Sequence, residues 1–243
     1  MYRSSRSVKI TYMLNPNAPL PDDVYDRLPG RIPVLDQSIP VDAARWHEAL
    51  TACDLPIPVG KLAGSGSGQI ALSRADVFAV ANQEPTPAGA LQLLWYSLAW
   101  GLGIRAPRLH ARLDAIADDP DRASELLAAA WRSVRDAGDP ETDYAILTTP
   151  HGAGRIKWLG PAFSTKFLYF AHGPNATPTH LILDRVVATK LQVTAWPAAP
   201  TTGWWPSAYG AYCALMHHWA AEASDRSGRD VSPDEIEFTV FKG

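Results

Sequence analysis

The sequence predicts a mainly α-helical protein, most clearly over residues 73–243. Segment after segment in this region repeats apolar residues with the helical period, and Pro or Gly residues separate the segments. Strict alternation of apolar and polar residues, which is typical of half-buried strands, is scarce. With 243 residues, 47% of them hydrophobic and 19% charged, the chain is long enough to bury a substantial core in one large domain or two small ones.

Individual helices are predicted from their end signals and apolar spacing. Residues 88–102 are apolar on all sides and predict a buried core helix that ends at Gly101 and Gly103. Ser232 and Glu235 form a capping-box pattern around Pro233 and predict the last helix. The full set of expected helices is 41–52, 73–81, 88–102, 107–117, 120–137, 140–148, 155–159, 163–170, 184–191, 206–219 and 233–241.

The first 72 residues differ in character from the rest. Residues 1–40 are rich in Pro, Asp and Arg, with a candidate strand over residues 8–14, and the Gly/Ser run at 64–68 has the composition of a linker. That run lacks the Lys-Ser/Thr of a P-loop and has Gly66 where a nucleophile elbow needs Ser. We expect residues 1–72 to form an irregular N-terminal arm and a helix packed on a helical domain of residues 73–243.

Charge is distributed unevenly along the chain. The net charge is −3, but residues 151–190 carry +4, which leaves −7 on the remainder. A basic patch on an acidic body suits a protein that binds a polyanion at one site. Chance clustering is the alternative.

Two cysteines, Cys53 and Cys213, are too few for a disulfide scaffold or a cysteine-based metal site, and a reducing cytoplasm suits them. The N-terminus has no apolar run typical of a signal peptide, and no segment is long enough to span a membrane. We therefore expect a cytoplasmic protein, monomeric, with no membrane contact, no metal and no cofactor.

One amine and one carboxylate are prominent in the basic region. Lys166 lies in an apolar helical segment, where a lone ammonium is costly unless it is paired or neutral. Asp184 follows three apolar residues and precedes an apolar helical run, which predicts a helix N-cap that also directs a carboxylate at a nearby site.

The order of turn, lysine-bearing helix, loop and Asp-capped helix resembles the helix-hairpin-helix DNA glycosylases, and more closely their 8-oxoguanine DNA glycosylase branch. That branch has a Pro-Gly-x-Gly-Thr-Lys hairpin and an aspartate about eighteen residues later. Residues 161–166, Pro-Ala-Phe-Ser-Thr-Lys, match at Pro, Thr and Lys, and Asp184 has the expected spacing. Ala162 and Ser164 replace the two hairpin glycines. The resemblance covers residues 73–243 and implies a helix-hairpin-helix around 155–170.

This resemblance implies roles for the residues that match. Lys166 would attack the sugar of a flipped nucleotide, and Asp184 would stabilise the positive charge that develops on it. The backbone of the hairpin and the basic side chains beside it would bind duplex DNA, with a polar residue from the end of an earlier helix filling the gap left by the base. The DNA-binding candidates are Arg155, Lys157, Gly160, Ala162, Ser164, Thr165, Asn82 and Gln83.

The pocket for the base is predicted to depart from the 8-oxoguanine pattern. Where that branch has a Cys one turn after the lysine, this chain has Phe170, and residues 203–222 contain no Gln. Aromatic residues that stack on bases or sugar rings replace them, and we expect the pocket to contain Phe170, Trp204, Trp205 and Tyr209. The hypothesis is a glycosylase, with possible AP-lyase activity, that excises a bulky modified base such as glucosylated hydroxymethylcytosine in phage DNA, as an antiviral defence.

Four alternatives stay open at this point. The protein could excise 8-oxoguanine, or it could be a catalytically silent protein that binds lesions or modified DNA. It could also be an unrelated helical interaction protein. Finally, Lys166 and Asp184 could form a structural ion pair, which alone does not imply catalysis.

Overall fold

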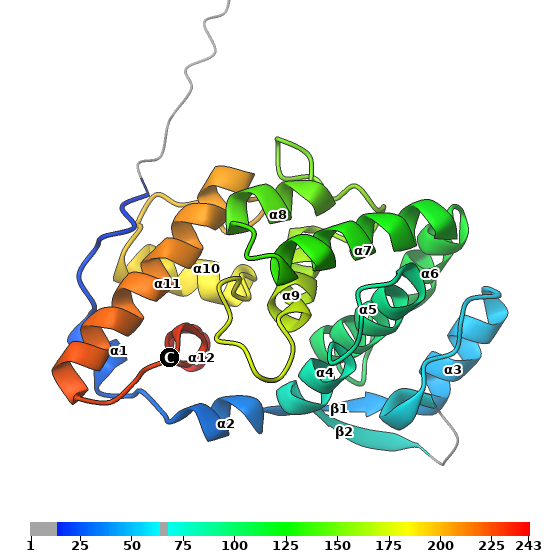
Figure 1. Ribbon diagram of the computed structural model, residues 1–243, viewed down its shortest axis with the longest axis horizontal. Coiled ribbons are helices and arrows are strands. Elements are labelled where there is room, and N and C mark those ends of the chain that lie inside the picture. The colour runs from blue at the N-terminus through cyan, green and yellow to red at the C-terminus, as the bar shows by residue number, and fades with distance from the viewer. Residues whose placement is uncertain (1–13, 64–67) are drawn as a thin grey trace, which may run out of the picture.

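The computed structural model describes residues 14–63 and 68–243 and is mainly helical, as predicted (Figure 1). The helices are α1 (Asp22–Tyr25), α2 (Arg31–Leu35), α3 (Ala43–Ala52), α4 (Arg74–Val80), α5 (Pro87–Leu102), α6 (Leu109–Ala117), α7 (Pro120–Arg135), α8 (Pro140–Leu147), α9 (Pro161–Ala171), α10 (Arg185–Thr194), α11 (Pro206–Ser227) and α12 (Pro233–Lys242). A 3₁₀ helix (Gly60–Ala63) and strands β1 (Ser38–Asp42) and β2 (Gln69–Ser73) complete them. No helix in the described ranges has the length and apolar character needed to cross a membrane.

Helix α5 is the central element of the fold. It packs against α4, α7 and α9, and its residues from Gly89 to Trp100 are buried apart from Gln92. Such a helix must be apolar all round, because it has no face in contact with water. The prediction of a buried core helix over residues 88–102 is therefore confirmed.

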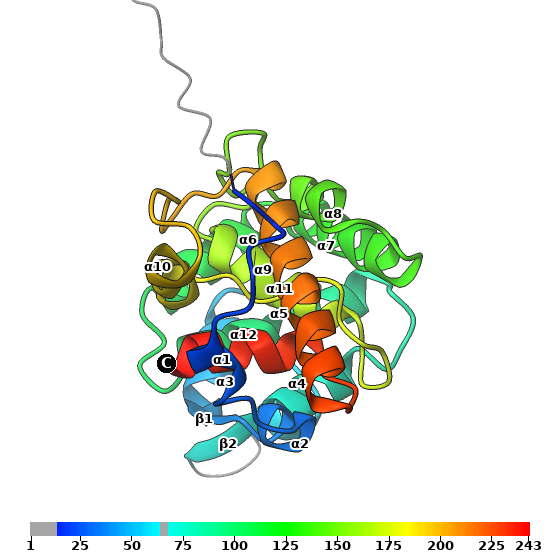
Figure 2. The same ribbon diagram turned by 90° about the vertical axis from the view of Figure 1, so that its left-hand side faces the viewer.

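The longest helix, α11, covers the other end of the molecule, where it packs against α8 and α12 (Figures 1 and 2). Helix α10 packs against α12 in turn. The buried apolar residues form one continuous core that runs from Leu20 to Val240. Residues on both sides of position 72 thus bury their side chains in the same core.

The sequence analysis missed the small antiparallel sheet. Strands β1 and β2 pair from Ser38 opposite Ser73 to Asp42 opposite Gln69, and the inward-facing Val41 and Leu72 are fully buried. Each strand has only five residues, and one contains Pro40, so neither gives a clear period-two signal. Of the candidate strand at residues 8–14, residues 8–13 lie outside the described part of the chain, as do residues 64–67 of the expected linker.

The segment before α9 differs from the expected helix over residues 155–159. It forms a tight turn in which the Leu159 amide donates to the Ile156 carbonyl at 3.0 Å. Trp158 has a φ of +64°, a left-handed conformation that a right-handed helix cannot contain. Helix α9, which carries Lys166, then starts with Pro161 at its first position and confirms the predicted helix there.

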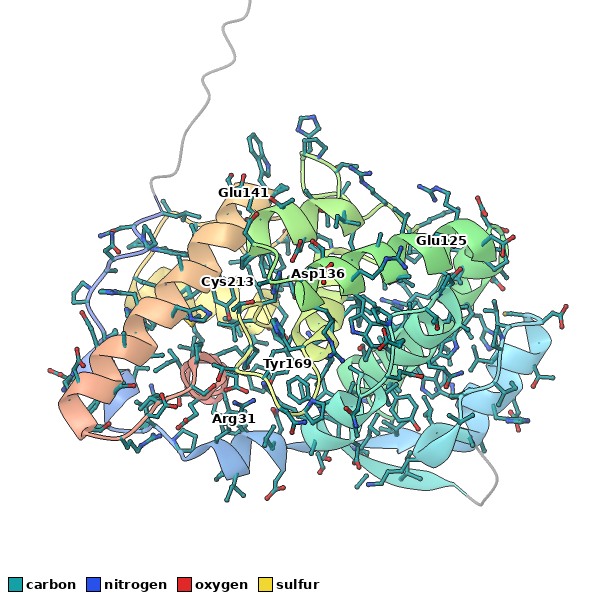
Figure 3. The ribbon with its side chains drawn as sticks, viewed as in Figure 1. Arg31, Glu125, Asp136, Glu141, Tyr169 and Cys213 are labelled. Carbon is teal, nitrogen blue, oxygen red and sulfur yellow. The ribbon has the colours of Figure 1, made fainter. Side chains whose placement is uncertain are left out.

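A buried polar cluster connects α9 to the helices around it. Figure 3 shows Tyr169 of α9 in the interior, near Arg31 of α2. Its hydroxyl donates to Asp234 of α12 at 3.1 Å and accepts from Arg74 of α4, which pairs with Glu237 at 2.7 Å. Partners for these buried charges limit the cost of removing them from water and give α9 a defined position.

Candidate active site

Lys166 and Asp184 lie together, as the sequence spacing predicted. The Lys166 Nζ is 3.2 Å from the Asp184 Oδ2, and the two side chains are 7% and 20% exposed. Lys166 comes from the middle of α9, and Asp184 is the residue that caps α10. The result is a largely desolvated amine and carboxylate in direct contact, with the carboxylate the more accessible of the two.

The methylene chain of Lys166 packs against a glycine of α5. A Cβ on Gly101 would meet the Lys166 Cδ at 2.9 Å and the Phe163 ring at 3.2 Å. The amine also lies over the face of the Phe163 ring, 6.0 Å from its centre, which is about the longest distance for a cation–π contact. Glycine at 101 thus provides the space that the lysine side chain occupies.

Asp184 is fixed by the start of its own helix. Its Oδ1 accepts hydrogen bonds from the amides of Val186 and Val187 at 3.0 and 3.2 Å. These amides have no partner within the helix, so the capping carboxylate satisfies them. One oxygen of Asp184 therefore positions the group, and the other faces the lysine.

Three side chains hold the extended strap Leu181–Leu183 that leads to Asp184. The hydroxyl of Tyr209 donates to the Leu181 carbonyl at 3.0 Å, and that of Tyr212 donates to the Ile182 carbonyl at 2.7 Å. Thr165 Oγ1 donates to the Leu183 carbonyl at 3.0 Å and accepts from the Leu183 amide at 3.1 Å. Burial raises the pKa of both phenols well above the usual value of 10.0, so they remain protonated donors.

A basic cavity of about 330 Å³ lies beside the pair. Three arginines line it, Arg108, Arg112 and Arg185, and none of the described residues in its lining is acidic. Arg185 follows Asp184 in the chain, and Phe163, which contacts Lys166, is also in the lining. We name this cavity the arginine pocket. Its charge suits an anionic ligand such as the DNA backbone.

Aromatic rings alternate with the arginines in this pocket. The Arg108 guanidinium lies 5.2 Å from the Trp158 ring centre, and the Arg112 guanidinium lies 4.8 Å from the Phe163 ring centre. Burial lowers the pKa of Arg112, and the nearby charge of Arg108 lowers it further. Interleaved guanidinium groups and rings can bind phosphates and stack on bases at the same place.

The predicted DNA contacts are only partly brought together. Gly160 and Ala162 line the arginine pocket, and Arg155 and Lys157 lie exposed on the turn before it. Arg155 uses its Nε to donate to the Thr148 carbonyl at 2.9 Å.

Ser164 and Thr165, two of the predicted DNA-binding residues, do not present their side chains to the solvent in this structure. Both residues are fully buried, because α9 turns these positions toward the core. Thr165 instead holds the strap before Asp184.

Asn82 and Gln83, the candidates for filling the gap left by a flipped base, lie elsewhere. They are exposed beyond the end of α4 and line a different cavity of about 440 Å³ with Lys61 and Asp76. The described lining of that cavity shares no residue with the arginine pocket. Their predicted role therefore gains no support from their position.

Two of the four predicted base-pocket residues belong to the core. Phe170 is fully buried against Phe78 and Trp100, and Tyr209 is fully buried beside Tyr144, so neither can stack on a base here. The sequence does not show which side of α9 or of α11 faces the core, so it could not exclude these two positions.

Of the other two predicted residues, Trp204 lines the arginine pocket. Trp205 is 54% exposed outside its lining, with its ring 6.1 Å from that of His151.

Sequence reasoning missed Trp158 and the three arginines of the pocket. Arg185 could have been suspected, because it directly follows the capping aspartate. Arg108 and Arg112 are four residues apart, a spacing that places side chains on one side of a helix. They come from the start of α6, more than 50 residues before Lys166, and only the folded chain shows that they meet the turn before α9.

A family model described as "Putative 8-oxoguanine DNA glycosylase OGG-like protein" matches residues 32–241. The match includes Lys166, Asp184 and every residue that lines the arginine pocket. It begins well before residue 73, where the resemblance in the sequence began, and so includes β1, α3 and β2. No curated protein and no solved structure matches the chain.

Proposed function

We infer that this chain, which belongs to the 8-oxoguanine DNA glycosylase OGG-like family, is a DNA glycosylase that excises a noncanonical base flipped out of duplex DNA. The observation that carries this inference is the contact of 3.2 Å between a desolvated lysine and a capping aspartate, next to a pocket lined by three arginines. A purely structural ion pair would need neither that pocket nor a partly accessible carboxylate.

In the proposed reaction Asp184 first takes a proton from the Lys166 ammonium, which their separation allows. The neutral amine attacks C1′ of the sugar while the bond from C1′ to the base breaks, and the base leaves with the bonding electrons and is protonated. Asp184 then gives that proton to the departing base, and the carboxylate that this restores stabilises the positive charge on the sugar.

An AP-lyase step would follow from the same amine. Opening of the sugar ring converts the adduct into a Schiff base between Lys166 and C1′. Loss of a proton from C2′ then breaks the bond from C3′ to its oxygen, and the 3′ phosphate leaves. Once the adduct has formed, this elimination requires only a base to take the proton from C2′. Asp184, which is adjacent to Lys166, can be that base.

The pocket composition favours a bulky, sugar-bearing pyrimidine as the substrate. The guanidinium groups of Arg108, Arg112 and Arg185 offer several donors for hydroxyl groups, and Trp204, although only 4% exposed, adds apolar surface to the same lining. Such bases occur in phage DNA, which would make the enzyme an antiviral one. Excision of 8-oxoguanine is the second candidate, because the family description carries that activity.

Base release from defined duplexes tests this proposal. Duplexes with glucosylated hydroxymethylcytosine, 8-oxoguanine or unmodified bases are incubated with the wild type, Lys166→Gln, Asp184→Asn and Lys242→Gln, and free bases are quantified by mass spectrometry. Lys242 is the control, since it is an exposed lysine at the end of α12, outside the lining of the arginine pocket. We expect release of one modified base, a loss of about 100-fold or more in both site variants, and near wild-type release by Lys242→Gln.

Two outcomes would revise the proposal in different directions. Release of 8-oxoguanine alone would exclude the bulky-base substrate and leave the catalytic pair in place. Tight binding of modified DNA with no release from any substrate would make the protein a silent sensor of modified DNA.

A further inference from the structure

Trp158 is an unusual residue for the position it occupies. It has a left-handed backbone, with φ of +64°, at a place in a tight turn where glycine would be free of strain. A bulky residue in this region is strained, and such strain is found most often at functional sites. The indole is 44% exposed, while its neighbours Ile156 and Leu159 are buried. The turn thus displays a large aromatic ring to the solvent.

The turn that carries Trp158 is held firmly. The Leu159 amide closes it on the Ile156 carbonyl, and Gly154 lies so close to the Leu159 carbonyl that no side chain could fit there. From α6, the Arg108 guanidinium lies over the indole at 5.2 Å. Arg108 also has a left-handed backbone, with φ of +57°. Two strained residues from separate segments therefore meet at one exposed contact.

The location of this contact connects it to the reaction. Trp158 and Arg108 both line the arginine pocket, and Trp158 lies three residues before Pro161, the first residue of α9, which is the helix that carries Lys166. Among the described residues, the exposed tryptophans are Trp158 and Trp205, and only Trp158 belongs to the pocket lining. An exposed indole and three guanidinium groups that can bind phosphates thus lie in one pocket.

We propose that Trp158 inserts into the duplex and stacks in the space that the flipped nucleotide leaves, with Arg108 holding the indole for that task. The proposal rests on the proposed function. When an apolar side chain inserts between base steps, its contacts in the opened duplex offset the cost of unstacking, and a rigid ring loses little entropy on insertion. The proposal gives Trp158 the role that was predicted for Asn82 and Gln83, which line another cavity.

A single-stranded substrate separates this role from catalysis, because it requires no flipping out of a duplex. Release of the modified base is measured in single turnover from duplex and single-stranded DNA for the wild type, Trp158→Ala, Trp158→Phe and the matched control Trp205→Ala. We expect Trp158→Ala to release the base about tenfold or more slowly than the wild type from duplex DNA, and less than twofold more slowly from single-stranded DNA. Trp158→Phe and Trp205→Ala should act nearly as the wild type does.

Binding to a duplex with a stable abasic analogue provides a second readout that requires no catalysis. The wild type should bind this duplex at least tenfold more tightly than an intact one, and Trp158→Ala should lose that preference. Two results would overturn the proposal. One is an equal loss of base release by Trp158→Ala from duplex and single-stranded DNA, and the other is a wild-type protein without any preference for the abasic duplex. Loss of the preference in Asn82→Ala or Gln83→Ala, with Trp158→Ala unaffected, would return the role to those residues. Absence of base release by the wild type, with the abasic preference intact and dependent on Trp158, would refute the glycosylase and leave this proposal standing.

Discussion

The position of the Lys166 amine depends on a residue that has no side chain. Gly101 of α5 leaves the space in which the lysine methylenes lie, and Phe163 closes the other side. A lone lysine in an apolar helix drew attention in the sequence, and so did the aspartate eighteen residues later. The glycine did not, because it read as part of a helix end. Steric fit between distant helices is a property of the folded chain alone.

Gly101→Ala is expected to impair base release without destabilising the protein. The added Cβ would displace the Lys166 side chain, and a shift of about 1 Å in a reacting group can cost about 100-fold in rate. Alanine in a helix is otherwise favoured over glycine by about 0.5–1 kcal/mol. Single-turnover release and thermal unfolding are the measurements, and Gly210→Ala of α11 is the control. An unchanged rate would show that the amine tolerates the displacement.

At the scale of elements, the segment between α9 and α10 is a strap fixed at three consecutive residues. Tyr209, Tyr212 and Thr165 bind the carbonyls of Leu181, Ile182 and Leu183, so α11 and α9 together determine where Asp184 lies. Tyr209 and Thr165 were both predicted to contact DNA. Both bind the strap instead, and we propose that they act by positioning Asp184.

Thr165→Val should slow base release while DNA affinity stays the same. The substitution preserves the shape but removes the donor to the Leu183 carbonyl and the acceptor for its amide, and each unpaired buried group costs about 1–3 kcal/mol. Thr165→Ser retains both hydrogen bonds and should restore the rate. If Thr165→Val weakens DNA binding and leaves the rate unchanged, Thr165 contacts DNA as the sequence suggested.

Elements whose sequence signals are local could be predicted, whereas elements that depend on contacts between distant residues could not. Helices such as α5 and α12 have local signals, namely a capping residue, a Pro at the first position and apolar spacing, and their bounds came within a few residues. The sheet required pairing between Ser38 and Ser73, which no local pattern reveals. The sequence predicts helix at Trp158, where the structure has a turn, because a tryptophan with positive φ carries no sequence signal.

At the scale of the molecule, a buried histidine pair makes stability depend on pH. His172 Nε2 accepts hydrogen bonds from the amides of Thr179 and His180, and Arg135, His180 and His217 add unfavourable charge interactions. Burial is the main reason that the pKa of His172 falls from 6.5 to about 3. The folded protein therefore keeps this imidazole neutral under conditions in which the unfolded chain protonates it.

The sign of the pH effect follows directly. Above pH 6.5 the histidine is neutral in both states and stability is unaffected; below 6.5 the unfolded state binds the proton and stability falls until about pH 3. The expected loss is about 1.4 kcal/mol per pH unit in this window. Urea unfolding from pH 7 to pH 4 measures it, with His172→Gln as the comparison. Equal slopes for both proteins would contradict the assignment to His172.

The arginine pocket is also a property of the whole molecule. Its arginines come from α6 and from the start of α10, and the overall charge of −3 gave no indication of where they meet. The excess of positive charge in residues 151–190 did indicate the right part of the chain. What the sequence could not supply was the contribution of α6, which the fold brings from more than 50 residues away.

Covalent trapping tests the central claim most directly, namely that the Lys166 amine attacks the sugar. The protein is incubated with duplex DNA that carries a modified base or an abasic site in the presence of borohydride, which reduces a Schiff base to a stable adduct. We predict an adduct with the wild type and with Lys242→Gln, and none with Lys166→Gln. An adduct that persists in Lys166→Gln, or base release by the wild type without any adduct, would contradict the claim.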